Sequence, residues 1–234
     1  MHMEATYSTI YESATDFDIT LQKYDFRVLR SFLKGPAVLE MGCGRGETTR
    51  LLAEIFPHLH VVDASRRCIE LSSAGVPKTV RFFQYYFEEF EPPCHYDSIL
   101  LLEVLEHLED PVLTLKRAAS WLNLGGAIHI LVPNARSLHR RLGVAMGMLP
   151  AVDALNDRDR QVGHRRVYTL ESLIADVNDA GLQVARHQGI FLKILSNAQM
   201  EKLDPKLIDA LFVVGDELPD FCSDIYMKAA QIEV

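Results

Sequence analysis

The chain has 234 residues, of which 48% are hydrophobic, and its formal net charge is −8. This composition predicts one globular domain with a sizeable core, because disordered chains have too few hydrophobic residues to bury. The acidic balance argues against general affinity for nucleic acid or for an anionic membrane. No apolar run in the sequence approaches the length of a membrane span.

The N-terminal residues lack a basic region followed by an apolar core, so we expect no secretory signal. The four cysteines, Cys43, Cys68, Cys94 and Cys222, are scattered and form no C-x-x-C pair. They therefore predict a reduced, cytoplasmic setting without a disulfide framework or a cysteine-based zinc site.

Residues 1–19 are polar and aromatic and predict no long helix. From residue 20 to residue 33 apolar side chains recur at helical spacing, which predicts a helix that stops at Gly35-Pro36.

A glycine-rich stretch follows this helix. Residues 36–41 predict a strand that contains Glu40, and Gly42, Gly44 and Gly46 then stand at alternate positions before a helix that ends near Pro57. Glycine tolerates positive φ and lets a ligand approach the backbone, and the helix start offers free N–H groups to polar or negative groups. A purely structural turn is one alternative. A dinucleotide fingerprint is another, although its spacing is G-x-G-x-x-G.

The second predicted strand, residues 58–63, also ends in an acid, Asp63. An acid at this position can accept hydrogen bonds from ribose hydroxyls. It can equally cap the helix predicted over residues 65–73.

The middle of the chain continues this alternation. Residues 80–85 predict a third strand and residues 96–102 a buried fourth strand, followed by Glu103-Val104-Leu105-Glu106-His107. A helix is predicted from Pro111 to Leu122, with its stop at residues 123–126, and a fifth strand over residues 127–132 ends in Pro133-Asn134.

The glycine loop, Asp63 and the block from Glu103 to Asn134 resemble, in this order, class I S-adenosylmethionine-dependent methyltransferases. The resemblance covers roughly residues 20–195 and is strongest to the branch of ubiquinone-type O-methyltransferases and small-metabolite enzymes. It implies an α/β, Rossmann-like fold over residues 1–234. That fold has a seven-stranded, mostly parallel sheet, helices on both faces and an antiparallel last strand.

The resemblance also implies the site. S-adenosyl-L-methionine is the expected cofactor, and residues 1–34 are expected to form an N-terminal lid with Tyr11 on the substrate, or else a plain packing helix. Tyr86 stands where the family often has an aspartate for adenine, so Phe87 or Glu88 is expected to replace that contact. The implied cofactor contacts are Glu40, Gly42, Cys43, Gly44, Asp63, Ala64, Phe87, Glu88 and Glu103.

Residues 135–166 predict an insertion on the substrate side of the sheet. They contain seven arginines against three aspartates. This local positive charge predicts an anionic small-molecule acceptor held by Arg136, Arg165 and Arg166. A solvated face with internal ion pairs is the alternative, and the Asp-Arg-Asp-Arg run at 157–160 fits it.

Glu103, Glu106 and His107 stand at i, i+3 and i+4 and would share one face of a helix. Three interpretations are open. The residues cap and solvate the helix, or His107 or His164 is a general base, or Glu103, Glu106, His107 and His164 bind a divalent metal. The last resembles small-RNA terminal 2′-O-methyltransferases and some ubiquinone-type enzymes.

The rest of the chain predicts a helix over 169–180 capped by Thr169, a strand over 183–195, a helix over 204–214 and a last strand over 222–232. We predict O-methylation of a small anionic metabolite, with N-methylation next. The alternatives are an RNA 2′-O-methyltransferase, a non-catalytic cofactor-binding protein and a nicotinamide-dependent oxidoreductase.

Overall fold

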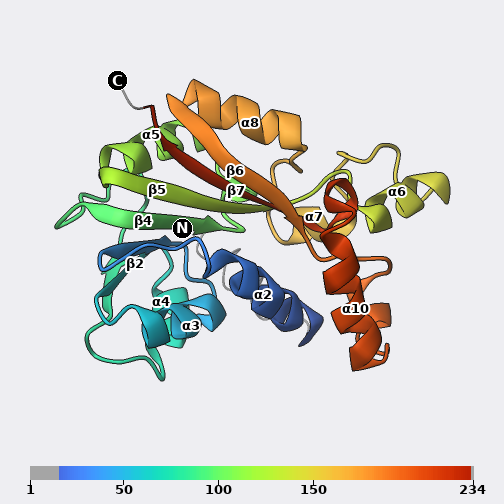
Figure 1. The fold of residues 1–234 in the computed structure, drawn as a ribbon, viewed down its shortest axis with the longest axis horizontal. Coiled ribbons are helices and arrows are strands. Elements are labelled where there is room, and N and C mark those ends of the chain that lie inside the picture. The colour runs from blue at the N-terminus through green and yellow to red at the C-terminus, as the bar shows by residue number, and fades with distance from the viewer. Residues whose placement is uncertain (1–15, 233–234) are drawn as a thin grey trace.

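A single twisted sheet forms the centre of the molecule in the computed structural model, which describes residues 16–232 (Figure 1). The strand order is β3-β2-β1-β4-β5-β7-β6, and β7 is antiparallel to both of its neighbours. The predicted seven-stranded Rossmann-like sheet with an antiparallel last strand is therefore confirmed. The strands are β1 (Val38–Met41), β2 (Leu59–Asp63), β3 (Arg81–Gln84), β4 (Tyr96–Leu102), β5 (Leu122–Pro133), β6 (Leu182–Ile190) and β7 (Asp224–Gln231).

Helices cover both faces of the sheet. They are α2 (Asp16–Leu29), α3 (Glu47–Ile55), α4 (Arg66–Ser73), α5 (Pro111–Ser120), α6 (Leu138–Ala145), α7 (Asp157–Gln161), α8 (Leu170–Asp179), α9 (Asn197–Met200) and α10 (Pro205–Gly215), with short 3₁₀ turns at Leu105–His107 and Pro219–Phe221. None of the helices described over residues 16–232 has both the length and the apolar character that crossing a membrane requires.

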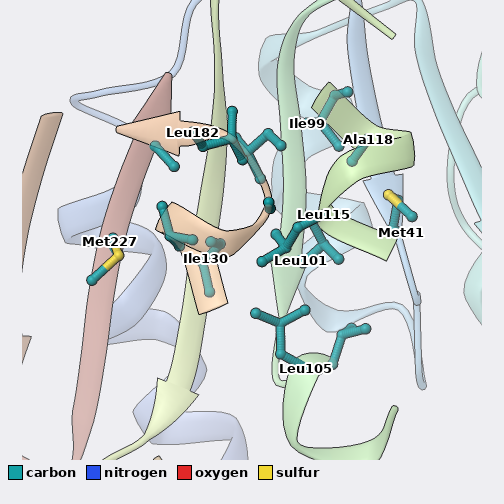
Figure 2. Packing of buried hydrophobic residues seen from close by; sticks show 14 of the residues in the cluster. Met41, Ile99, Leu101, Leu105, Leu115, Ala118, Ile130, Leu182 and Met227 are labelled. Atoms are coloured by element: carbon teal, nitrogen blue, oxygen red, sulfur yellow. The ribbon is translucent and has the colours of Figure 1, made fainter. Parts of the chain in front are cut away.

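Two apolar cores sandwich the sheet. On one face, Leu115 and Ala118 of α5 pack with Ile99, Leu101 and strand residues beside them (Figure 2). Side chains of α2, α3, α4 and α10 form the second core on the opposite face. Because the central strands are covered on both faces, nearly every side chain of β1 and β4 is buried, as the continuous apolar runs predicted.

The parallel strands end at one edge of the sheet, where α2, α6, α7 and α10 gather (Figure 1). Antiparallel β7 begins at this same edge, because Asp224 pairs with both Pro133 and Ile190. Residues from the end of the chain therefore reach the edge at which open α/β sheets bind their ligands.

The N-terminal helix differs from its prediction, since α2 begins at Asp16 instead of residue 20. Phe17 is buried and its ring meets that of Phe191 edge to face at 5.9 Å. The helix also buries Asp25, so its inner face mixes apolar and charged side chains. That mixture hides the first turn from a periodicity search. The lid prediction for residues 1–15, including Tyr11, lies outside the described residues.

Candidate active site

The glycine loop between β1 and α3 depends on its glycines. Gly42, Gly44 and Gly46 have φ of 83°, 50° and 82°. A Cβ on Gly42 would lie 2.8 Å from Val104 Cγ2, and one on Gly46 would lie 2.5 Å from Ser72 Cα. No side chain caps the start of α3. The loop is thus a tight backbone cradle that leaves N–H groups of the helix start available to a ligand.

Asp63 holds this loop against β2. Its carboxylate accepts hydrogen bonds from the Cys43 amide at 2.9 Å and from the Ser65 amide at 2.8 Å. Burial raises the pKa of Asp63, and the amide hydrogen bonds partly offset that rise. The cap of α4 is Ser65, whose hydroxyl accepts from the Cys68 amide. The alternative that Asp63 itself caps this helix is therefore wrong.

Glu40 is buried at the end of β1, with one carboxylate oxygen that has no hydrogen-bond partner among the described residues. Burial raises its pKa to about 8, and a hydrogen bond with Thr49 partly counteracts this. An unpartnered carboxylate facing a cavity is costly unless a cationic ligand joins it. The cradle and Glu40 together fit the amino-acid end of S-adenosyl-L-methionine, which carries an ammonium group.

A cavity of about 1050 Å³ opens at the carboxyl edge of the sheet beside the loop. Its walls come from the glycine loop, α2, the segment after β4, α6, α7 and the segment after β6. Of the predicted site residues, those lining it are Glu40, Gly42, Cys43, Gly44, Glu103, His107 and His164.

The other predicted cofactor residues lie outside this cavity, toward β2 and β3. Asp63 is the last residue of β2 and Ala64 follows it. Phe87 lies near the loop, since a Cβ on Gly42 would be 3.9 Å from its ring. Glu88 is exposed. Their predicted contacts to ribose and adenine stay predictions.

The three arginines predicted to bind an anion do not line the cavity. The guanidinium of Arg136 forms an ion pair with Glu171 at 2.7 Å. That of Arg166 donates to the carbonyls of Leu108 and Glu109. Arg165 is placed by its backbone, because its amide donates to the Glu106 carbonyl at 2.8 Å. The structure thus brings none of the three guanidinium groups into the described cavity wall.

The spacing predicted that Glu103 and His107 share one helix face, but in the structure they do not. Glu103 has a φ of 56°, and only Leu105–His107 form a 3₁₀ turn. A positive φ is unusual for a residue with a side chain and reverses the chain directly after β4. This turn directs Glu106 inward, where it is fully buried.

Glu106, His107 and His164 nevertheless come together. A Glu106 oxygen lies 3.9 Å from the Nε2 atom of each histidine, and the two imidazole centroids are 4.7 Å apart. Burial, together with the nearby charge of His164, lowers the pKa of His107 to about 4. Burial raises the pKa of Glu106 to about 7, while His164 acts to lower it. His107 is therefore neutral near pH 7.

His164 is oriented from its other side by Asp159. Its Nδ1 lies 3.5 Å from Asp159, whose other oxygen accepts from Arg140 at 3.0 Å. Burial by itself would raise the pKa of Asp159. The adjacent His164 imidazole, the hydrogen bond from the Asn156 amide and the Arg140 guanidinium together outweigh burial and lower it to about 2. Asp159 is therefore a stable anion beside the His164 ring.

Sequence reasoning missed Asp159 and Arg140 as site residues. A local signal for Asp159 existed, because Asn156 and Asp159 form a capping box at the start of α7. Arg140 gave no comparable signal, since its partners are 12–19 residues further along the chain. The Arg140–Asp159 bridge and the 3.8 Å contact of Arg160 with Asp157 support the alternative of internal ion pairs for these residues.

The same three side chains form a donor set for a metal ion. One ligand atom each from Glu106, His107 and His164 lie within 4.8 Å of one another. Two imidazoles and a carboxylate suit a divalent transition ion. Glu103, the fourth predicted ligand, does not belong to this group among the described residues.

Comparison with known proteins bears on this site. The family model described as a methyltransferase domain matches residues 17–187, which is most of the chain. The chain belongs to this family. The predicted class I S-adenosylmethionine-dependent methyltransferase is thereby confirmed.

Relatives of this methyltransferase-domain chain match it only in part. An uncharacterized protein of Synechococcus is 33% identical over 105 residues, which are 42% of this chain and 25% of that protein. The ubiquinone biosynthesis O-methyltransferase of Xanthomonas campestris pv. campestris is 24% identical over 117 residues, 48% of this chain and 49% of that enzyme. The matches thus span half or less of the length of these relatives.

Solved structures share the fold over nearly the whole methyltransferase domain. The CcbJ methyltransferase of Streptomyces caelestis has a TM-score of 0.65 at 14% identity and covers 98% of this chain and 99% of its own. The 1,6-didemethyltoxoflavin-N1-methyltransferase of Burkholderia thailandensis, solved with S-adenosylhomocysteine, has a TM-score of 0.64 at 17% identity, covering 99% and 88%. At these identities the likeness concerns the fold.

Proposed function

We propose that this protein transfers the methyl group of S-adenosyl-L-methionine to an oxygen of a small-molecule acceptor. The observation that carries this proposal is the shared cavity, in which the glycine loop and Glu40 face the same space as His107 and His164. A cofactor-holding backbone and a proton-accepting group must stand together for methylation of a hydroxyl.

The bound cofactor supplies an activated methyl group, and the residues of this chain position the reactants. Gly42 and Gly44 would present their backbone to the cofactor, Glu40 would hold its ammonium group, and Asp63 would bind its ribose. Asp63 also fixes the loop through the Cys43 amide. Alignment of the acceptor oxygen with the methyl carbon is the main contribution of such a site.

His164 accepts the proton of the acceptor hydroxyl at Nε2 in this mechanism. Asp159 lies 3.5 Å from its Nδ1 atom, and the Glu106 carboxylate lies 3.9 Å from its Nε2 atom. Both carboxylates stabilise the imidazolium that forms. His107, held neutral by burial, adds no competing positive charge.

A metal-dependent route to the same product is the second candidate, favoured by the close grouping of Glu106, His107 and His164. A divalent ion held by these three residues would lower the pKa of the acceptor hydroxyl. The metal-dependent RNA 2′-O-methyltransferase belongs to this candidate.

Support for an anionic acceptor is weaker than the sequence indicated. Arg136, Arg165 and Arg166 do not line the cavity, and the Arg140 guanidinium that does is already paired with Asp159. We therefore propose a small polar acceptor.

One assay tests these proposals. Chelator-treated protein is incubated with methyl-labelled S-adenosyl-L-methionine and an extract of the source organism, and the labelled products are separated by size and charge. Label in a small molecule with a new O-methyl group supports the proposal, and label confined to RNA or protein contradicts it. Activity without added metal supports His164 as base, whereas activity that returns only with Mg²⁺ or Mn²⁺ supports the metal route.

A further inference from the structure

We propose that Asp25 and Asp224, with Glu103 beside them, form a subsite for a positively charged amine group of the methyl acceptor. The proposal rests on the proposed methyltransferase function and adds the chemical class of the acceptor. Asp25 comes from the middle of α2, Glu103 from the turn after β4 and Asp224 from the start of β7, and all three line the cavity.

The three acids lie close enough for their charges to interact. Asp224 and Asp25 each act electrostatically on Glu103, and Asp224 also acts on Asp25. Asp25 and Asp224 are each only 8% exposed, so water screens this repulsion poorly. Buried like charges this close are unfavourable unless a cation joins them.

Two of the carboxylate oxygens in this cluster lack a hydrogen-bond donor within residues 16–232. One oxygen of Asp25 and one of Glu103 have no hydrogen-bond partner among the residues that the structure describes. Both groups belong to a cavity wall, so a ligand can reach them. Buried polar atoms are nearly always hydrogen-bonded in folded proteins, so unpartnered carboxylate oxygens facing a cavity indicate a donor that arrives with a ligand.

Two cations of the chain stand nearby, but neither completes the cluster. Lys193 is half-buried and interacts electrostatically with Asp224 and Glu103, yet within residues 16–232 its ammonium forms no ion pair with either acid. Arg158 pairs with Asp18 at 3.3 Å instead. Acids therefore predominate in this part of the cavity wall, where Asp18, Asp25, Glu103 and Asp224 face Lys193 and Arg158.

An ammonium group suits this position better than a neutral polar group does. It donates three hydrogen bonds and brings a positive charge that balances the negative charges of the carboxylates. It would sit between α2 and β7, so that the rest of the acceptor extends toward the cluster of Glu106 and His164. The subsite would then orient the acceptor as well as bind it.

A charge series of one-ring probes tests the proposal. Benzylamine, benzyl alcohol and benzoate have similar size and differ in charge, and their binding to protein saturated with S-adenosylhomocysteine is followed by NMR titration with chelator present. We expect benzylamine to bind roughly tenfold more tightly than benzyl alcohol, and benzoate to bind most weakly. Equal affinities, the reverse order, or no binding of benzylamine at millimolar concentration would overturn the subsite.

Variants locate the effect. Asp25→Asn keeps the side-chain shape, and we expect a roughly tenfold loss for benzylamine with unchanged affinities for benzyl alcohol and S-adenosylhomocysteine. Asp224→Asn is the second test should Asp25→Asn fold poorly. The matched control is Asp179→Asn, which removes an equal charge from an exposed position at the end of α8.

The failures of the two proposals differ. If S-adenosylhomocysteine itself does not bind to the wild-type protein, the proposed function fails. If S-adenosylhomocysteine binds, but Asp25→Asn lowers its affinity as much as it lowers that of benzylamine, the acids belong to the cofactor site. The amine subsite is then wrong. Displacement of benzylamine by Mg²⁺ in the wild-type protein and not in Asp25→Asn would replace the amine with a metal ion.

Discussion

The glycine-loop end of the cavity is built mainly from backbone, whereas the opposite end is built from side chains. At the loop, three glycines with positive φ and the Cys43 amide on Asp63 set the shape within one short stretch of sequence. At the other end, Asp25, Asp159 and Asp224 come from three distant segments. A backbone cradle suits a cofactor shared by many enzymes, and assembled side chains allow each enzyme its own acceptor.

This contrast predicts that changes at the two ends affect different quantities. Substitutions at the loop should change stability and cofactor affinity. Substitutions at the side-chain end should change turnover and acceptor binding while sparing the cofactor.

The largest effect is expected for His164→Asn. Loss of the proton acceptor should lower kcat for the acceptor found in the extract assay by roughly 10²- to 10⁴-fold. Affinity for S-adenosylhomocysteine, measured by calorimetry, should not change. His139→Asn is the control, because it removes another half-buried histidine of the cavity wall that lies outside the Glu106 cluster. Equal losses in both variants would show that His164 has no special part in proton transfer.

Gly46→Ala tests the backbone end. The added Cβ would lie 2.5 Å from Ser72 Cα. The backbone at this position also has a positive φ of 82°, which alanine adopts only with strain. We expect a loss of about 3 kcal/mol in the free energy of unfolding, from strain and overpacking together. Urea denaturation measures it, and Gly75→Ala, which also has positive φ but an open surrounding, is the matched control. Similar losses in the two variants would mean that crowding against Ser72 is unimportant.

Asp63→Ala should weaken binding of S-adenosylhomocysteine by roughly 10- to 100-fold, since charged hydrogen bonds contribute about 1.5–3 kcal/mol each and some are replaced by water. The Cys43 and Ser65 amides would also lose their acceptor. Calorimetry gives the change. An unchanged affinity would remove Asp63 from the cofactor site.

The pH dependence of stability should reveal Glu40. Its folded pKa is about 8 against an ordinary value of 4.5, so the folded state keeps a proton that the unfolded state releases. The contribution of Glu40 to the free energy of unfolding is therefore complete below pH 4.5 and is lost as the pH rises toward 8. Denaturation without cofactor should therefore show a smaller decline over this range in Glu40→Gln than in wild type. Parallel curves would contradict the buried, protonated Glu40.

The sequence allowed the glycine loop and its neighbouring acids to be predicted because their determinants are local. Alternate glycines, an acid at the end of each of two strands and the apolar runs of β1 and β4 are all visible within short windows. The sheet followed from the same patterns, whereas the start of α2 and the helix expected to carry Glu103 were wrong.

The acceptor end could not be predicted in this way. Asp224 reaches the cavity only because β7 runs antiparallel beside β5, and Arg140 meets Asp159 across an insertion. The arginines at 136, 165 and 166 looked suitable by charge alone, yet their guanidinium groups lie outside the cavity wall. The charge of a sequence segment says little about the direction in which its side chains extend, because that direction depends on tertiary contacts.

The position of β7 also affects how the protein forms on the ribosome. This strand follows β6 in the chain, yet it lies between β5 and β6, and within the described residues β6 pairs with no other strand. Until residues 224–231 emerge, β5 exposes one edge and β6 has no place in the sheet. The nascent chain therefore carries an open sheet edge until β7 has been synthesised. Asp224 also reaches the cavity wall only at that point.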